Sequence, residues 1–409
     1  MATQVQTEYD VGGVLLDRPF KIRRLGHFGF NIVNIEEGRE FYVNLLGFRI
    51  SDVMDWAPRV PNPEMLAGLG PTNGYFTRYG GDHHAFVMFP KRVLESVRPP
   101  RPGSQVTINQ ITWQTGSLAE VVNATHWLSE RGVETQRSGR DMPGSNWHTY
   151  IYDPDGHINE LYYGIEQIGW DGHSKPKPMY NRRFTETASL PQISEYDEVQ
   201  QALADGTDVL SGYRHESSAP ATFDVDGIML RRPFKIVRIG PVNLFVEDVQ
   251  RAVDFYSQTL GFVPTEESTV DGERCTFLRT NTEHHSVGFF PIALRERLGF
   301  SPHTTTMAFG VQLANYRQLR DAVTFLRDHG VKVLDNLPVE LHPGIDYAAY
   351  AFDPDGHAVQ LYCNMEQIGW DGRPRPREQR RPVDPNNWPA TLSPMSDTYL
   401  GEPFLGPWG

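Results

Sequence analysis

The chain has 409 residues, and its 38 Lys and Arg against 51 Asp and Glu give a formal net charge of -13. A charge of this sign argues against nucleic acid or an anionic membrane as the main partner. The two cysteines, Cys275 and Cys363, are too few for a disulfide framework or a cysteine-rich zinc site.

The chain begins MATQVQTEYD, which has neither the basic start nor the apolar run of a signal peptide. No stretch approaches the ~20 apolar residues that a membrane-spanning helix needs. We therefore expect a soluble, cytoplasmic protein.

The first predicted elements lie between residues 21 and 90. KIRRLGHFGFNIV (21–33) alternates apolar and polar residues as a strand does. NIEEGREFYVNLLGF (34–48) predicts a helix, with Asn34 as the candidate cap and Gly47 as the stop. GYFTRYGG and HHAFVMFP then predict two strands joined by a Gly-Gly turn.

The same order of elements returns between residues 105 and 164. QVTINQITWQT predicts a strand, and SLAEVVNATHWLSERGV predicts an amphipathic helix that ends at Gly132. HTYIYDPDGHINELYYG predicts a hairpin that turns at DPDG. In this turn Asp153, Asp155 and His157 are better explained by turn formation than by metal binding. Beyond it, SEYDEVQQALAD (194–205) predicts one helix.

An internal repeat decides the predicted domain organisation. The repeated pairs are VGGVLLDRPFKIRRLG (11–26) with VDGIMLRRPFKIVRIG (225–240), GREFYVNLLGF (38–48) with QRAVDFYSQTLGF (250–262), DHHAFVMFP (82–90) with EHHSVGFFP (283–291), and EQIGWDG at 166–172 and 366–372. We predict homologous domains at 11–172 and 225–372, a polar linker at 173–224, and a Pro- and Trp-rich arm at 373–409. The arm is expected to wrap a neighbouring domain or subunit, and the aromatic residues of EQIGWDG to pack between the repeats.

Each half therefore contains two units of one strand, one helix and three strands. The predicted fold class is α+β, with four βαβββ modules paired into two homologous domains. This pattern, with L-G-F closing a helix and D-P-D-G-H-x-x-E-L before the last strand, resembles the vicinal oxygen chelate superfamily of glyoxalases, epimerases and dioxygenases. The paired halves and the H-H-x-x-x-x-F-P strand resemble type I extradiol catechol dioxygenases in particular.

The resemblance implies a metal site. In extradiol enzymes two His and one Glu bind Fe(II) on one face, which leaves positions open for substrate and dioxygen. The matching residues here are His27 on the first strand, Gln110 on the first strand of the second module, and Glu160 on the closing strand. Gln110 departs from the expected His. An ion pair between His27 and Glu160 without metal is the alternative.

In the second half, Pro241, Ala308 and Gln360 stand at the three ligand positions, so this half is expected to be metal-free. The resemblance also implies an acid-base role for His84 and a substrate hydrogen bond for Tyr150. Both have twins in the second half, His285 and Tyr350, which fits strand packing equally well.

His148 has no such twin, because Ala348 replaces it. It could supply the missing nitrogen ligand, or it could be a surface residue before a strand. The sequence shows no nucleotide-binding or other organic-cofactor motif.

These features predict an Fe(II)- or Mn(II)-dependent ring-cleaving dioxygenase that acts with O2 on a catecholic or related small aromatic substrate. A non-oxidative, metal-dependent isomerase or lyase of the same superfamily is one alternative, and a metal-free protein that binds an aromatic ligand is another. We expect no nucleic-acid or membrane partner, and we expect a homo-oligomer.

Overall fold

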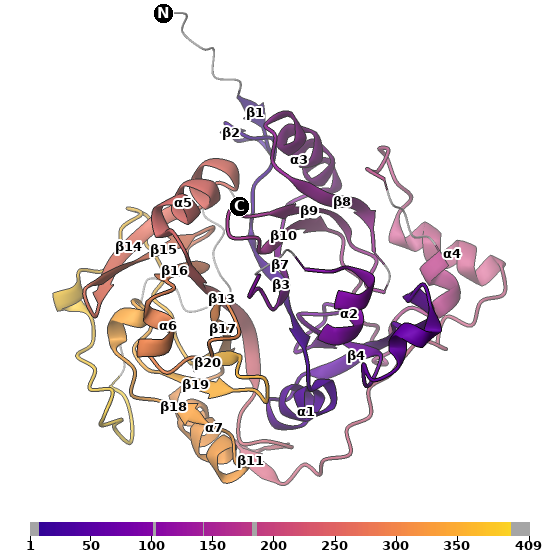
Figure 1. The fold of residues 1–409 in the computed structure, drawn as a ribbon. Coiled ribbons are helices and arrows are strands. Elements are labelled where there is room, and N and C mark those ends of the chain that lie inside the picture. Colours follow the sequence, from indigo (N-terminus) through magenta and orange to yellow (C-terminus); the bar gives the residue numbers. More distant parts are fainter. Residues whose placement is uncertain (1–7, 101–103, 142, 182–185, 394–409) are drawn as a thin grey trace, which may run out of the picture.

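The computed structural model describes residues 8–100, 104–141, 143–181 and 186–393 (Figure 1). Each half of the chain forms one eight-stranded mixed sheet, in the orders β4-β5-β6-β3-β7-β10-β9-β8 and β14-β15-β16-β13-β17-β20-β19-β18. The identical orders confirm the predicted α+β class and the two homologous halves.

Each half is two four-stranded modules joined at their first strands. The first half comprises β3 (Arg24–Ile32), α1 (Ile35–Arg39), the π-helix η1 (Glu40–Leu45), β4 (Arg49–Asp55), β5 (Asn73–Arg78), β6 (Phe86–Pro90), then β7 (Ile108–Gln114), α3 (Leu118–Glu130), β8 (Thr135–Arg140), β9 (Trp147–Tyr152) and β10 (Ile158–Tyr163). The second comprises β13 (Ile236–Val246), α5 (Val249–Asp254), the π-helix η5 (Phe255–Thr259), β14 (Val263–Val270), β15 (Glu273–Arg279), β16 (Val287–Pro291), then β17 (Thr306–Leu313), α7 (Tyr316–Asp328), β18 (Val333–Leu334), β19 (Ala348–Phe352) and β20 (Ala358–Tyr362).

Short elements connect or extend these modules. They are the hairpin β1 (Tyr9–Asp10) and β2 (Leu15–Leu16), the 3-10 turns η2 (Ala57–Arg59) and η3 (Pro63–Leu66), α2 (Lys91–Val97), η4 (Lys177–Asn181), α4 (Glu195–Ala204), the hairpin β11 (Phe223–Val225) and β12 (Ile228–Leu230), α6 (Leu294–Arg297), η6 (Val339–Leu341) and η7 (Arg377–Gln379). The predicted helix in the linker is α4, which Ser194 caps by accepting a hydrogen bond from the Asp197 N–H.

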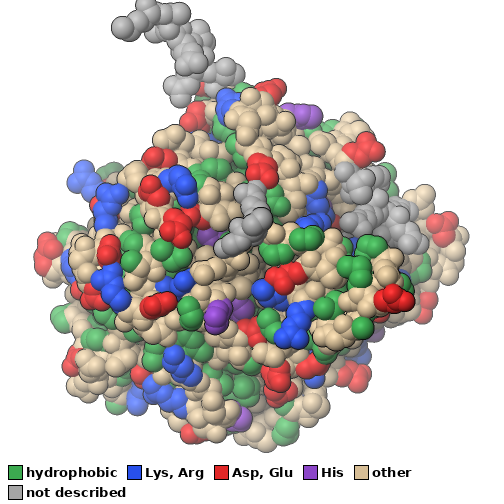
Figure 2. Space-filling view, viewed as in Figure 1, with side chains coloured by type: hydrophobic (Ala, Val, Ile, Leu, Met, Phe, Trp, Pro, Cys, Tyr) green, Lys and Arg blue, Asp and Glu red, His purple; other side chains and the backbone are tan. Residues whose placement is uncertain are grey.

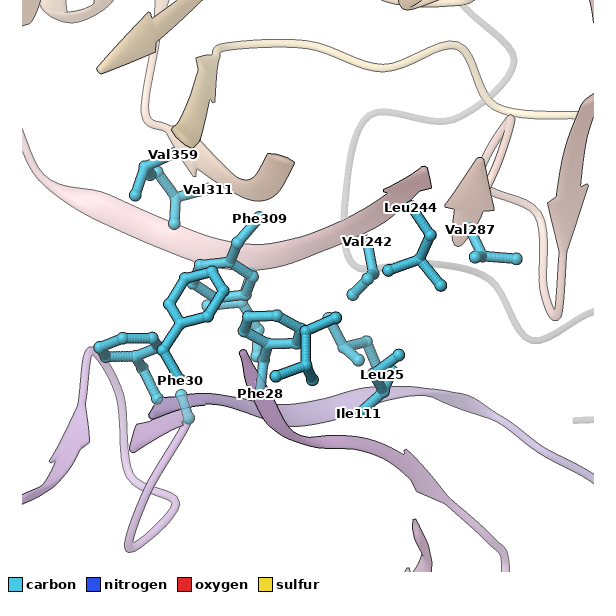
Figure 3. Packing of buried hydrophobic residues seen from close by; sticks show 14 of the residues in the cluster. Leu25, Phe28, Phe30, Ile111, Val242, Leu244, Val287, Phe309, Val311 and Val359 are labelled. Atoms are coloured by element: carbon cyan, nitrogen blue, oxygen red, sulfur yellow. The ribbon is translucent and has the colours of Figure 1, made fainter. Parts of the chain in front are cut away.

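The two sheets pack against each other through apolar residues of their central strands. Phe28 of β3 stacks on Phe309 of β17 with ring centroids 4.7 Å apart, and both are fully buried. Figure 3 shows Phe28 and Phe30 of the first half next to Phe309 of the second, and Leu25 on the side of Val242 and Leu244. This shared core leaves the opposite face of each sheet free to form its own interior.

Each DPDG turn binds the other half of the chain. Asp353 Oδ1 accepts hydrogen bonds from backbone N–H groups of its own turn, while Oδ2 accepts one from the Tyr42 hydroxyl at 3.0 Å. In the equivalent contact of the other turn, Asp153 Oδ2 accepts a hydrogen bond from the Tyr256 hydroxyl at 3.2 Å. The turn residues thus form their turns as predicted, and they also hold the halves together.

The helix predicted at 34–48 forms as α1 followed by η1, and Gly47 ends it with φ +97°. Asn34 occupies the N-cap position as predicted, but its side chain makes no capping hydrogen bond. Instead Asn34 donates to Asp355 Oδ1 at 2.8 Å, and Asp355 Oδ2 accepts from the Val33 N–H. The carboxylate at this helix start comes from the other half.

The prediction that the aromatic residue of EQIGWDG packs between the repeats was wrong. Trp170 and Trp370 are 109% and 99% exposed, each at the tip of a turn. The neighbouring aspartate forms that turn, since Asp171 and Asp371 accept from the N–H groups of His173 and Arg373. The motif repeats a turn rather than a packing contact.

The arm that follows the second half lies against that half over its described part. Trp388 packs on Tyr347 at 5.1 Å, and Tyr316 donates to the Pro389 carbonyl at 2.8 Å. Arg380 forms an ion pair with Glu266. The arm was predicted to wrap a neighbouring domain or subunit. Residues 373–393 contact a domain of the same chain, and residues 394–409 lie outside the described residues.

Among the described residues, no helix has the length and apolar character required to cross a membrane. Acidic and basic side chains are interspersed over the face of the molecule shown in Figure 2.

Candidate active site

Three adjacent strands bring His27 and Glu160 together across the middle of the first sheet. The strand order is β3-β7-β10, and Thr112 of β7 is in register with His27 on one side and with Glu160 on the other. His27 Nε2 lies 3.1 Å from Glu160 Oε2, although the residues are 133 positions apart in sequence. The structure therefore places the predicted imidazole and carboxylate in direct contact.

Glu160 is fully buried and is surrounded by hydrogen-bond donors. Asn146 Nδ2 donates to Oε1 at 2.6 Å, and Thr112 Oγ1 donates to Oε2 at 2.8 Å. Burial favours the neutral acid, but the charge and hydrogen bond of His27, with smaller effects of His148 and Thr112, outweigh it and lower the pKa of Glu160. Glu160 is thus an ionised carboxylate inside the protein.

Gln110 lies on β7, two residues before Thr112 and therefore on the same face of the sheet. Its Oε1 accepts a long hydrogen bond of 3.4 Å from the Tyr150 hydroxyl. Burial, and then the nearby charge of Glu160, raise the pKa of Tyr150 well above its usual value of 10. Tyr150 is consequently a neutral hydroxyl that can donate a hydrogen bond.

His84 lies beside His27, with their ring centroids 4.3 Å apart. Burial, together with His27 and His83, lowers the pKa of His84 well below 6.5, so the ring is neutral near pH 7. Gly144 closes over it with φ +100°, and a Cβ at Gly144 would lie 2.8 Å from His84 Cε1. Only glycine allows this loop to pack on the imidazole.

The contacts of His148 are with Arg137 and Asp141 and not with His27 or Glu160. Its Nε2 lies 3.3 Å from Arg137 Nη1, and its Nδ1 lies 3.7 Å from Asp141 Oδ2. The Arg137 guanidinium also lies 4.3 Å above the Tyr150 ring and binds Asp141 through both terminal nitrogens. The metal-ligand role of His148 stays a prediction. These contacts give it no support, because the Arg137 guanidinium lies beside its Nε2 atom.

Most of these residues, but not Glu160, Thr112 or His148, line a cavity of about 430 Å³. His27, His84, Gln110, Asn146 and Tyr150 form its polar end. The rest of the lining combines apolar side chains, among them Met54, Trp56, Phe76, Phe89, Leu94, Val97, Val106 and Ile108, with charged ones, among them Arg59, Glu95, Arg98, Arg137 and Asp141. The volume and the mixture of an apolar wall with a few convergent polar groups are typical of a small-molecule site.

The second half has no equivalent arrangement among its described residues, because its interior is filled. Leu334 faces Tyr350 where Arg137 faces Tyr150 in the first half. The interior is packed with apolar side chains, including Phe245, Phe290, Phe300, Met307, Ala308, Leu341, Ala348 and Phe352. Gln360 donates to the Tyr350 hydroxyl at 3.0 Å. The first half therefore contains a cavity at the position where the interior of the second half is packed with side chains.

The donor atoms at the polar end of the cavity suit one divalent cation. Within the described ranges, no group of three His, Cys, Asp or Glu side chains could hold a metal. His27 and Glu160 provide an imidazole nitrogen and a carboxylate, and Gln110 Oε1 is the nearby neutral oxygen. Asn146 and Thr112 support the carboxylate as outer partners of metal ligands do, whereas His27 Nδ1 is buried without a hydrogen-bond partner in the described part of the chain. The set therefore fits a cation with two firm ligands and one weak one.

Sequence reasoning missed four residues of this site: Thr112, Arg137, Asp141 and Asn146. A usable signal was present, because Leu341 and Leu334 replace Asp141 and Arg137 in the second copy. Polar residues that become apolar in the repeat mark the cavity. Thr112 and Asn146 depend on strand register and on a loop path that the sequence does not reveal.

Comparison with known proteins places the chain in a family. The family model described as Glyoxalase/Bleomycin resistance protein/Dioxygenase superfamily matches residues 24–161 and 238–361. No curated protein sequence matches the chain.

Solved structures share the fold at low sequence identity. The Mn(II)-bound glyoxalase from Novosphingobium aromaticivorans has a TM-score of 0.53 and 13% identity, covering 93% of this chain and 97% of its own. Homoprotocatechuate 2,3-dioxygenase from Arthrobacter globiformis gives 0.54 and 17%, covering 87% and 84%. The 2,3-dioxygenase LapB from Pseudomonas sp. KL28 gives 0.55 and 15%, covering 87% and 96%. The chain belongs to the glyoxalase/bleomycin resistance protein/dioxygenase superfamily.

Proposed function

We propose that the first half is the active site of a metal-dependent, ring-cleaving dioxygenase for a catecholic or related aromatic substrate. The observation that carries this proposal is the contact at 3.1 Å between the Glu160 carboxylate and His27, which lines an aromatic-walled cavity together with His84 and Tyr150. Structural likeness to several catechol-type dioxygenases supports the same reaction class.

In this proposal His27, Glu160 and Gln110 would hold Fe(II) or Mn(II). The ion, when bound, supplies Lewis acidity and the redox chemistry that dioxygen requires. The chain's own residues perform the remaining tasks. The wall of Trp56, Phe76 and Phe89 binds the aromatic ring and excludes water.

Proton handling falls to the two groups that face the cavity beside the metal site. The neutral His84 ring can take a proton from a substrate hydroxyl and return it later. Tyr150 donates a hydrogen bond that orients a substrate oxygen. Homo-oligomerisation and a cytoplasmic location stay predictions from the sequence.

A second candidate is a non-oxidative, metal-dependent isomerase or lyase. Gln110 favours it, because an amide oxygen is a hard, neutral ligand that suits a redox-inert cation. The chain's likeness to the Mn(II)-bound glyoxalase is in the same range as its likeness to the dioxygenases. Turnover without dioxygen, supported equally by Zn(II) or Mg(II), would identify this activity.

The test combines metal content with oxygen uptake. Protein purified anaerobically and loaded with Fe(II) is expected to retain about one ion per chain and to consume oxygen with members of a catechol panel. Glu160→Gln removes the one anionic ligand and is expected to weaken metal binding by at least about 100-fold. Gln360→Ala, at the equivalent position of the second half, is the matched control and should keep metal and activity.

Two outcomes would contradict the proposal. Glu160→Gln that retains full metal and full activity would show that the His27–Glu160 pair is structural. A metal-free protein that binds a small aromatic compound without turnover would identify the chain as a binding protein.

A further inference from the structure

Both halves contain the same chain of one carboxylate and two adjacent histidines. In the first half, Asp52 Oδ2 lies 2.8 Å from His83 Nε2, and His83 Nδ1 lies 3.0 Å from His84 Nδ1. In the second, Glu266 Oε2 lies 3.0 Å from His284 Nε2, and His284 Nδ1 lies 3.1 Å from His285 Nδ1. All four imidazoles are buried. We call these two chains the first and second histidine relays.

The direction of the hydrogen bonds in the first relay follows from the donors available. A carboxylate at Asp52 only accepts, so His83 Nε2 carries the proton of that bond. Where His83 carries that proton alone, its Nδ1 is an acceptor, and His84 donates to it from Nδ1. The remaining nitrogen, His84 Nε2, keeps its lone pair. No described residue forms a hydrogen bond with it, and His84 lines the cavity.

We propose that Asp52 and His83 are positioning residues, which fix His84 as the Nδ1–H tautomer and present the Nε2 lone pair to the cavity. Only the chemical consequence of this positioning, proton transfer from the substrate to His84, rests on the proposed function. The substrate O–H bond breaks, its proton forms a new N–H bond at His84 Nε2, and the electron pair stays on the substrate oxygen. His84 becomes an imidazolium until it returns the proton.

The reversed tautomer cannot perform this step. If His83 donated from Nδ1, His84 Nδ1 would accept and Nε2 would carry a proton toward the cavity. A histidine in that form donates a hydrogen bond but cannot take a proton. The carboxylate at Asp52 therefore decides, through His83, which reaction His84 can assist.

The second relay is a built-in control. It ends at His285 Nε2, which is buried without a hydrogen-bond partner among the described residues, in the half whose interior is filled. A relay that only stabilises its strands should be equally important in both halves. A relay that also positions a base should affect turnover only in the first.

The experiment compares Asp52→Asn with Glu266→Gln. The amide that Asp52→Asn introduces can donate to His83 Nε2, which allows the reversed tautomer to form. We expect kcat on an accepted aromatic substrate to fall at least about tenfold while KM changes less than about threefold. In 15N spectra of histidine-labelled protein, the His84 resonances, assigned with His84→Gln, should show loss of the Nδ1–H form. Glu266→Gln should leave kcat and the His84 resonances unchanged.

His83→Gln tests the same geometry without a second imidazole. A glutamine can donate to Asp52 and accept from His84 Nδ1, so this variant should keep more activity than His83→Phe. Unchanged kcat and His84 tautomer in Asp52→Asn, or an equal loss of kcat in Glu266→Gln, would overturn the inference. If the tautomer responds as expected but wild-type protein turns over no aromatic substrate, the proposed function fails and the positioning role stands.

Discussion

The contact between Tyr42 and Asp353 offers a direct test of how the two halves are held together. Tyr42 is fully buried in η1 of the first half, and its hydroxyl donates to the Asp353 carboxylate of the second half at 3.0 Å. Burial, and then the neighbouring Asp353 carboxylate, raise the pKa of Tyr42 well above 10, so the hydroxyl stays a donor at every working pH. Tyr42→Phe deletes this single hydrogen bond and conserves the packing of the ring.

The expected loss follows from the acceptor that remains. A hydrogen bond to a charged group contributes about 1.5–3 kcal/mol. Asp353 Oδ2 keeps one donor after the substitution, His357 Nδ1 at 2.9 Å, so the carboxylate is not left without partners. We therefore expect the free energy of unfolding to fall by about 1.5–3 kcal/mol, without the additional term that a cavity would bring.

Urea unfolding followed by tryptophan fluorescence measures this loss. Tyr196→Phe is the control, because Tyr196 is 70% exposed and its substitution should stay within about 0.5 kcal/mol of wild type. A Tyr42→Phe variant as stable as this control would refute the view that the DPDG turns dock the halves. Separate unfolding transitions for the two halves in Tyr42→Phe alone would support that view further.

Three further predictions concern the cavity and the buried histidines. Asn146→Ala removes the donor at 2.6 Å from Glu160 and should weaken divalent-metal affinity by about 10–100-fold in calorimetric titrations, with the fold retained. Burial, and then neighbouring histidines, lower the pKa of His285 well below 6.5, so the unfolded chain binds a proton that the folded chain does not. Stability to urea should accordingly fall as pH drops below 6.5, by up to about 1.4 kcal/mol per pH unit for each such histidine. Gly144→Ala should lower kcat because the added Cβ would displace the histidine beneath it, whereas Gly68→Ala, also at positive φ but in open space, should not.

The fold was predictable because its information is repeated. Strand alternation, the L-G-F helix ends and the DPDG turns occur twice in the same order, so each half supports the interpretation of the other. The partners of those turns were not predictable. Asp153 and Asp353 form local turns with one carboxylate oxygen and bind the opposite half with the second, and only the first role is encoded in neighbouring residues.

The candidate site was predictable in part for a similar reason. His27 and Glu160 lie on strands whose positions the repeat defines, so their convergence follows from the module order. The partners of Glu160 could not be derived, because Asn146 lies on a loop and Thr112 meets Glu160 through the register of two parallel strands. Trp170 was misplaced because an aromatic residue in a repeated motif suggests packing, while burial depends on which side of a turn it occupies.

The comparison of the two copies separates structural from functional residues. The carboxylates of the DPDG turns are the same in both halves, because each accepts a hydrogen bond from a tyrosine of the other half. Arg137 and Asp141 are not retained in the second half, because its interior is packed with apolar side chains and leaves no equivalent cavity among the described residues. His84 is the informative exception. Its twin His285 keeps the same hydrogen bonds with no cavity in front of it among the described residues, so the relay alone does not make a catalytic group. What distinguishes His84 is that the relay ends at the cavity beside His27, so under the proposed function only this copy could take a proton from a substrate.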